Sequence, residues 1–289
     1  MASVRDLRKR IKSVKSTQKI TKAMKMVAAA RLRKAQEAAE KSNPYSKVIN
    51  DLFADLSADE SLKKHPLFNK REVKQKLVLV FSSDRGLCGS FNSSSFKKAL
   101  ELLKDESVKL YTFGRKADSF FKRKYKNRIY KSNASFWENF DVKSAQELSK
   151  ELAQLYIDKS FDEIVFIYNE FISIMNQEIR VETVLPLVAT QKNKEVKEDK
   201  EQAEKPYLFE PGKEKILESL IPRALDVRVY RPCLHSLASE FGARMAAMDS
   251  ATRNAGEMID DLTLTMNRVR QANITRELVE IISGAEALG

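Results

Sequence analysis

The C-terminal part of the sequence carries the apolar pattern that most limits how the chain can fold. From residue 234 to residue 269, apolar or small residues recur at alternating spacings of four and three over five heptads. A seam of this length and period is typical of a coiled coil. At about 1.5 Å per residue, roughly 50 helical residues form a rod about 75 Å long, which exceeds a globular face. The seam consists of Leu234, Ala238, Phe241, Met245, Met248, Thr252, Ala255, Ile259, Leu262, Met266 and Val269.

Both ends of this seam have distinctive neighbours. At its far end stand Asn273, Arg276 and Glu280, where packing against a single partner helix must stop. Before the seam, residues 213–231 have a helical pattern but contain Pro222 and abut Pro232, so we expect a kinked or broken helix there. A last apolar stretch covers more than one side of the helix, with Leu278, Val279, Ile281, Ile282, Ala285 and Leu288.

The N-terminal segment is the natural partner of the C-terminal rod. Residues 1–43 contain no Pro or Gly, and Val4, Leu7, Ile11 and Val14 form one helical stripe. The stripe falters at Gln18 and Thr21, a gap that indicates a surface facing something besides the partner helix. Helical pattern resumes after Pro44 and reaches about Leu56. Because both helices lie at chain ends joined by a compact middle, we expect antiparallel pairing; the alternative is two amphipathic helices on a globular core. Beyond the gap, the stripe resumes on a shifted line with Ile20, Met24, Val27 and Leu32.

The positive charge of the chain is concentrated in the N-terminal helix. Residues 1–34 contain twelve basic residues and one acid, Asp6, so they carry nearly all of the net charge of +12. This basic arm is compatible with a solvated helix face, with a footprint for nucleic acid or an anionic membrane, and with a surface for an acidic protein partner. An organelle transit peptide has a similar composition. Composition alone does not choose among these functions.

The middle of the chain has the pattern of an α/β domain. Continuous apolar runs at 77–81 and 164–168 indicate buried parallel strands, 108–113 indicates another strand, and 179–187 alternates as an edge strand does. Helical patterns at 94–103, 117–124 and 145–156 lie between them. Strands alternating with helices predict a small doubly wound sheet.

These patterns together predict the fold class and the division of the chain. We expect an α/β protein in which a long antiparallel coiled coil of the N- and C-terminal helices accompanies a central Rossmann-like α/β domain. The N-terminal helix covers 1–57, the α/β domain 75–190, a charged loop 191–212 and the C-terminal helix 213–289. Within that loop, residues 191–205 are low in complexity and balanced in charge.

One loop has a pattern that suggests catalytic or ligand-binding chemistry. Residues 82–92 read SSDRGLCGSFN between a strand and a helix, which is where phosphates often bind. The loop lacks both the GxGxxG spacing and a following Lys-Ser/Thr pair, so Gly86 and Gly89 indicate a tight turn rather than a nucleotide site. Cys88 is either a nucleophile or a small packed residue, and His65 and His235 lie far from it in sequence.

Other classes of site and protein are excluded by composition. The two Cys and two His lack the closely spaced Cys pair and His pair of a zinc site, and no segment approaches the roughly 18 apolar residues of a membrane span. We therefore expect no catalytic residue, no metal and no cofactor. An interaction or mechanical role suits such a chain better than catalysis.

Three segments resemble one known family. Residues 8–29 (RKRIKSVKSTQKITKAMKMVAA) resemble the N-terminal motif of the gamma subunit of F-type ATP synthases, and residues 82–92 resemble its central motif. Residues 238–288, from ASEFGARM to SGAEAL, resemble its C-terminal motif. The motifs occur in the family's order and span the chain. The chain is identified on this basis as a member of that family.

The resemblance implies a function. The paired terminal helices would be the central rotor shaft that couples ion flow through the membrane ring to ATP synthesis or hydrolysis at the alpha and beta subunits. The nucleotide sites would belong to those subunits, so the chain itself would be non-catalytic. Its implied partners are the alpha and beta subunits of the hexamer, the epsilon subunit and the membrane c-ring, without nucleic acid.

The resemblance also implies contact residues. Met24 and Lys25 match the region beside a lever of the beta subunit, and the basic arm would face acidic beta loops. Arg270 and Gln271 match a pair that hydrogen-bonds a catch loop of beta. A smooth bearing tip in an apolar collar would follow. The remaining implied residues are Thr275 and Glu277 for contact with beta, and Leu278, Ile281, Ile282 and Leu288 for the tip.

Some features depart from the family pattern or qualify it. Ser90 stands where the family usually has a second Gly, and the 191–205 segment lacks the Cys pair of redox-regulated chloroplast forms. Because the family motif begins within ten residues of the start, we expect the basic arm to belong to the mature protein. That favours a bacterial chain, peripheral on the cytoplasmic face of the inner membrane.

The competing hypotheses are a nucleic-acid-binding protein that uses the basic arm and an enzyme that acts through Cys88.

Overall fold

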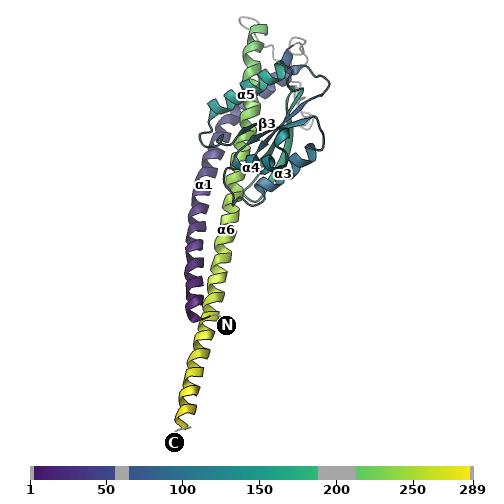
Figure 1. Cartoon of the computed structure of the whole chain (residues 1–289). Helices are drawn as coiled ribbons and strands as arrows, with labels where there is room; N and C mark the ends of the chain where they lie inside the picture. The colour runs from purple at the N-terminus through teal and green to yellow at the C-terminus, as the bar shows by residue number, and fades with distance from the viewer. Residues whose placement is uncertain (1–2, 56–64, 188–212, 287–289) are drawn as a thin grey trace, which may run out of the picture. The chain divides into compact units, whose positions relative to one another are not determined.

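The computed structural model of the chain describes residues 3–55, 65–187 and 213–286. They form two compact units. The first combines the residues up to Ala30 with those from Arg244 onward, and the second runs from Arg31 to Ala243. Figure 1 labels some of the elements of both units. The loop predicted over 191–212 and the tip residue Leu288 lie outside the described residues.

Two long helices begin and end the described chain, as predicted. Helix α1 spans Val4–Asp55 and α6 spans Lys213–Glu286, with 52 and 74 residues. Neither reaches both the length and the apolar content of a membrane span, and no other helix among the described residues does so.

Helix α6 corrects the expectation of a break near its start. It continues through both Pro222 and Pro232. A proline inside a helix removes one hydrogen bond and costs about 3 kcal/mol or more. Ile221, Val229 and Cys233, next to these prolines, are buried in the core of the second unit. Tertiary packing of this face offsets the local loss, because packing supplies most of the stability of a helix in a protein.

The second unit contains a five-stranded sheet with strand order β3-β2-β1-β4-β5. Strands β1 (Lys76–Phe81), β2 (Val108–Phe113), β3 (Ile129–Asn133) and β4 (Glu163–Phe171) are parallel. Strand β5 (Gln177–Leu185) runs antiparallel to β4 at one edge. In the centre, Val78 is paired with Leu110 on one side and Val165 on the other. The predicted Rossmann-like sheet and its edge strand are confirmed.

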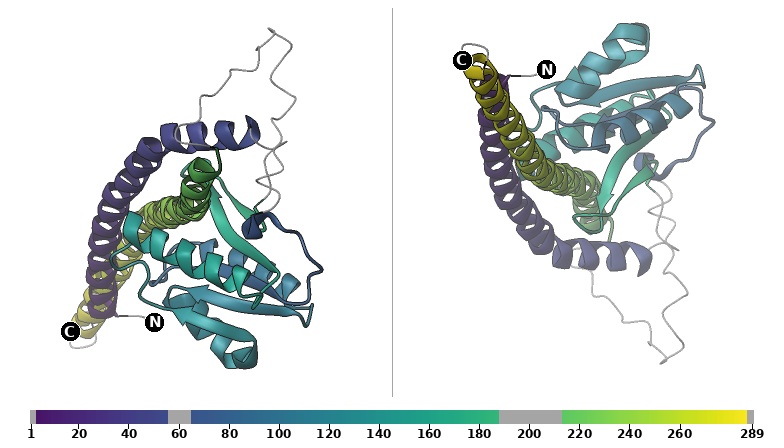
Figure 2. Two further views of the ribbon diagram at one scale, coloured as in Figure 1. Left: turned by 90° about the horizontal axis from the view of Figure 1, so that it is seen from above. Right: turned by 90° about the horizontal axis from the view of Figure 1, so that it is seen from below.

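Helices cover both faces of this sheet (Figure 2). On one face, α5 (Val142–Ile157) and the first half of α6 pack against side chains such as Leu79, Phe81 and Phe166. On the other face, α3 (Phe91–Leu102) and α4 (Arg115–Lys124) pack against Val78 and Val80. The alternation of side chains along β1 therefore supplies both apolar layers.

Strand β3 was missed by sequence reasoning. Its residues, IYKSN, include no apolar run, and none of them is fully buried. It lies at the sheet edge opposite β5 and hydrogen-bonds only β2. An edge strand with a solvated side has a weak apolar pattern, so the position of β3 is set by its pairing with β2.

Tyr111 gives the second unit a pH-dependent contribution to stability. Its hydroxyl donates to Glu151 at 3.3 Å, and Lys131 bonds the same carboxylate at 2.7 Å. Burial, followed by the charge of Glu151, raises the pKa of Tyr111 to about 12. The folded phenol keeps its proton where the unfolded phenol loses it, so this contribution is complete below pH 10 and declines towards pH 12.

We expect Tyr111→Phe to reduce the alkaline loss of stability. One pKa unit corresponds to about 1.4 kcal/mol, so the rise of the pKa from 10 to about 12 should make the two proteins differ by about 2 kcal/mol in their loss of stability between pH 8 and pH 11.5. Urea unfolding at about pH 8 and pH 11.5 measures the difference between the variant and the wild type. An equal decline in both proteins would contradict the assignment.

Candidate functional site: the paired helix ends

In the first unit, α1 and α6 lie side by side and antiparallel. Lys25 Nζ is 2.5 Å from Asp249 Oδ1, and the hydroxyls of Thr21 and Thr252 are 2.7 Å apart. Gln18 Nε2 donates to the carbonyl of Thr252 at 3.4 Å. Residue numbers fall along α1 as they rise along α6, so the predicted antiparallel pairing is confirmed.

The α6 side of this pair follows the predicted seam. Every seam residue in the first unit is buried or half-buried, while Met258 and Leu264, which lie off the seam, are exposed. The spacing of apolar residues therefore identified the contacting face of α6. The seam residues in this unit are Met245, Met248, Thr252, Ala255, Ile259, Leu262, Met266 and Val269.

The α1 side corrects the predicted shift. Thr21 is only 8% exposed, whereas Ile20 and Val27, predicted on the shifted line, are 57% and 56% exposed. Gln18 and Thr21 thus face the partner helix, and the stripe from Val14 continues through them to Ala28. Their burial is tolerable because their polar groups find partners on α6. Helical spacing alone, with Gln18 and Thr21 counted as members of the stripe, would have predicted that the paired face runs from Val14 to Ala28.

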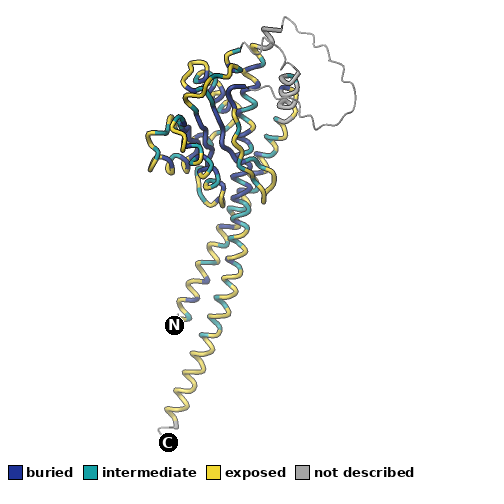
Figure 3. Tube along the Cα trace, turned by 90° about the vertical axis from the view of Figure 1, so that its right-hand side faces the viewer, coloured by how far each residue is buried: buried dark blue, intermediate teal, exposed yellow. Residues whose placement is uncertain are grey.

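Helix α6 continues past the region that α1 covers. Helix α1 begins at Val4, and every described residue from Arg270 to Ala285 is exposed (Figure 3). The predicted end of the seam near Asn273 is confirmed. The exposed set includes Arg270, Gln271, Thr275 and Glu277, and the Thr275 hydroxyl donates to the Gln271 carbonyl at 3.0 Å.

Large apolar side chains lie on this unpaired end. Leu278, Val279 and Ile282 are more than half exposed, and Ile281 reaches 67%. Apolar side chains clustered in this way, with charged residues around them, indicate an interaction surface. The unpaired end is therefore a candidate docking surface with polar residues near Arg270 and an apolar stretch beyond.

The basic arm of α1 faces solvent in the first unit. Within the described chain, none of its eight cationic residues between Arg5 and Lys22 forms an ion pair, and all eight are exposed. Lys25 differs, because it is partly buried and paired with Asp249. The hydrogen bond from Lys25 lowers the pKa of Asp249. Met24, predicted beside Lys25 as a contact, is half-buried. The eight are Arg5, Arg8, Lys9, Arg10, Lys12, Lys15, Lys19 and Lys22.

The loop at 82–92 has the geometry of a packed turn. Gly89 adopts a positive φ of 56°, and Leu87 one of 63°, whereas Gly86 does not. Cys88 is buried, and Asn92 Nδ2 lies 3.2 Å from its sulfur. His65 and His235 each accept a backbone N–H elsewhere, from Leu67 and Phe171. The described residues therefore do not bring a histidine to Cys88.

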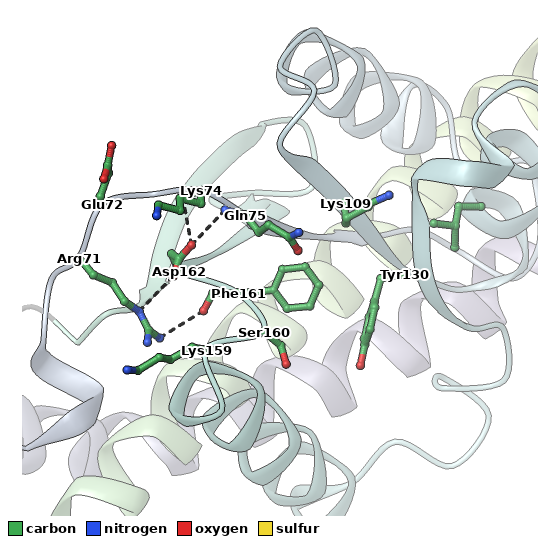
Figure 4. A pocket seen from close by; sticks show the side chains of 11 residues that line it. Arg71, Glu72, Lys74, Gln75, Lys109, Tyr130, Lys159, Ser160, Phe161 and Asp162 are labelled. Carbon is green, nitrogen blue, oxygen red and sulfur yellow. Dashed lines mark hydrogen bonds and ion pairs between the residues drawn. The ribbon is translucent and has the colours of Figure 1, made fainter.

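A hollow that the sequence did not indicate lies at the amino ends of the strands (Figure 4). It has a volume of about 970 Å³. Arg71 spans its wall, with Nε 3.3 Å from Asp162 and the guanidinium 4.1 Å above the ring of Tyr156. These contacts attach the segment before β1 to the end of α5. Lys74, Lys109 and Lys159 complete a mostly cationic rim.

No described group of three or more His, Cys, Asp or Glu side chains could hold a metal ion. The geometry of the candidate site is that of a surface: a helix pair with a charged side and an exposed end.

Comparisons with known proteins agree with this architecture. The family model described as ATP synthase matches residues 3–288. The ATP synthase gamma chain of Geotalea daltonii is 43% identical over 293 residues, covering 100% of this chain and 99% of the relative. The gamma chain of Pelagibacter ubique is also 43% identical, over the full length of both.

Solved structures share the fold. A chain of the Euglena gracilis mitochondrial ATP synthase, solved as OSCP/F1/c-ring, has a TM-score of 0.67 at 18% identity, over 99% of this chain and 94% of that one. A chain of the Tetrahymena thermophila mitochondrial ATP synthase central stalk and c-ring has a TM-score of 0.60 at 23% identity, over 80% and 99%. From the full-length match to curated gamma chains, this protein belongs to the ATP synthase gamma chain family.

Proposed function

We propose that this gamma chain is the central rotor shaft of an F-type ATP synthase, coupling ion flow through the membrane ring to ATP synthesis or hydrolysis at the alpha and beta subunits. The observation that carries the proposal is the antiparallel helix pair from which α6 continues with every described side chain exposed. A shaft needs this combination, because a paired section resists bending while a protruding end contacts surrounding subunits.

We infer that the chain supplies no catalytic group of its own. Cys88 is bonded to Ser83 and Asn92 inside the second unit, and both histidines accept backbone hydrogen bonds. A nucleophile needs a base within hydrogen-bond reach, and these contacts do not supply one for Cys88. The ATP chemistry is accordingly assigned to partner subunits.

The contact residues follow from the same proposal. Arg270, Gln271, Thr275 and Glu277 would contact the beta subunit, and their exposure supports this role. Lys25, next to Met24, keeps two of its three N–H donors beyond the bond to Asp249. The tip of Leu278, Ile281, Ile282 and Leu288 would turn in an apolar collar, where uncharged side chains avoid ion pairs that would favour one angle.

The proposed assembly comprises the alpha and beta hexamer, the epsilon subunit and the membrane c-ring. The bacterial relatives support a place on the cytoplasmic face of the inner membrane, where the chain would be peripheral. The exposed arm of α1 is suited to acidic loops of the beta subunits by charge complementarity.

Reconstitution tests the function. Mixing the chain with alpha and beta subunits of the same organism should yield a complex with one copy per hexamer and steady ATP hydrolysis. In that complex, Arg270→Ala with Gln271→Ala should lower turnover by about 10- to 100-fold, because a net loss of about 1.5–3 kcal/mol, typical of one hydrogen bond to a charged group, corresponds to that range. Arg268→Ala, an exposed arginine within the paired region, is the matched control and should leave turnover within about twofold. Persistent failure to recover a complex would refute the rotor role.

A further inference from the structure

The pairing of α1 and α6 in the first unit has two zones of different chemistry. Towards the start of α1, the paired face is apolar, with Val4, Leu7, Ile11 and Val14. The next two turns form what we call the polar zone, which consists of Gln18, Thr21 and Lys25 of α1 with Asp249, Thr252 and Gly256 of α6.

The apolar zone does not by itself select one axial position. Apolar contacts are non-directional, and seam residues recur at every turn of both helices. If one helix moved along the other by one turn, about 5.4 Å, apolar side chains would again meet apolar side chains. The two helices could then pair in more than one register with similar burial.

The polar zone distinguishes these registers by hydrogen bonding and charge. After a shift of one turn, Thr21 would lie opposite Met248 or Ala255 and lose its 2.7 Å bond to Thr252. Lys25 would lose Asp249, and in one direction would approach the like charge of Arg253. Directional bonds of this kind specify register in coiled coils even where they add little stability.

The sizes of the side chains in the polar zone favour the same register. The side chain of Gln18 lies against Gly256, where an added Cβ would come within 3.3 Å of Nε2. A one-turn shift would bring Gln18 to the larger side chain of Ile259 or Thr252 instead. The space left by Gly256 thus fits Gln18 in a single register.

We propose that the polar zone fixes the axial register of the two helices and so prevents them from sliding when the shaft is twisted. Twisting a two-stranded coil produces shear along its seam, and an apolar seam alone resists shear weakly. The six residues act as positioning residues. The register itself follows from the contacts, whereas its mechanical consequence rests on the proposed rotor function.

The test measures the distance between nitroxide labels in the full-length chain by pulsed electron paramagnetic resonance. Labels replace Lys9 and Ser250, which are exposed, while the native Cys88 and Cys233 are buried. These positions are well separated along the axis, so sliding changes their distance. The labelled protein with an unmodified polar zone should give a single, narrow distribution of distances between the two labels.

Two variants test the proposal in different ways: the first removes the polar contacts, and the second moves them along α6. Thr21→Val with Thr252→Val and Asp249→Leu removes the bonds but keeps the volume, and should add a second distance displaced by about 5 Å. Ala255→Thr with Thr252→Asp, Asp249→Leu and Ile259→Gly moves all the partners by three residues along α6. A move of three residues at about 1.5 Å each displaces the helices by about 4 Å. In that variant, most molecules should therefore show a distance between the labels that is longer by about this amount.

Thr263→Val is the matched control, because its hydroxyl bonds the Ile259 carbonyl of its own helix at 2.7 Å. It should leave the single distance unchanged. A single wild-type distance in both folded variants would overturn the proposal.

In the reconstituted synthase, ions pumped per ATP should fall at least twofold in the first variant, while hydrolysis continues. Shifted distances with unchanged pumping would instead overturn only the mechanical role.

Discussion

Replacing Gly114 with alanine is expected to lower the free energy of unfolding of the second unit by roughly 2–5 kcal/mol. Gly114 has a φ of 88°, and an added Cβ would lie 2.2 Å from the carbonyl oxygen of Ser82. The positive φ contributes about 1–2 kcal/mol, and overpacking typically contributes another 1–3 kcal/mol. Ser82 cannot move freely, because its hydroxyl bonds Phe113 and Ala117 and its carbonyl accepts from Trp137.

Gly89→Ala is the matched control for this substitution. Gly89 also has a positive φ, 56°, but no neighbouring atom lies within 4 Å of an added Cβ. The control isolates the conformational effect and should destabilise by only about 1–2 kcal/mol. Denaturant unfolding of both variants measures the difference. Equal losses would show that the backbone near Ser82 can move away from the new side chain.

Reversing the charge of the basic arm is expected to impair assembly severely. Lys12, Lys15, Lys19 and Lys22 are exposed, and changing all four to Glu lowers the charge of the arm by about eight. If the arm faces acidic loops of the beta subunits, association at low salt should slow by roughly 10- to 1,000-fold. Stopped-flow mixing with the alpha and beta subunits measures this rate.

The control applies the same charge change to the second unit. Lys97, Lys104, Lys124 and Lys126 are exposed there, and their reversal changes net charge equally. This variant should associate within a few-fold of the wild type, and circular dichroism should show intact helices in both. Equal slowing would mean that net charge, rather than the arm, governs assembly. If neither variant slowed, the proposed acidic partner of the arm would be rejected.

Several parts of the fold were predictable from the sequence because burial of apolar side chains has a local period. Residues 77–81 form a continuous apolar run, and all five are completely buried in β1. The α6 seam was predictable for the same reason, and so was its end near Asn273. The exposed end that carries Arg270 and Gln271 followed from that, although the partner roles of these residues stay predictions.

The structure differs from the sequence-based expectations at segments whose conformation depends on a partner that is distant in the sequence. Pro222 and Pro232 were expected to interrupt α6, but the helix continues because its buried face packs in the core of the second unit. Gln18 and Thr21 were expected to leave the paired face, but Thr252 satisfies them. β3 was missed because its pairing with β2, rather than an apolar run, holds it in place.

The sequence by itself determined the two long terminal helices, the α/β middle, the basic arm and the unpaired end. These features depend on apolar burial and charge, which are encoded along each segment without reference to a partner. Only the tertiary structure decided the register of α1 on α6, the continuity of α6 and the place of β3. Thr21 and Thr252 are separated by 231 positions in sequence, yet their hydroxyls meet at 2.7 Å. A hydrogen bond is directional and short-ranged, so its partner becomes known only when the chain has folded.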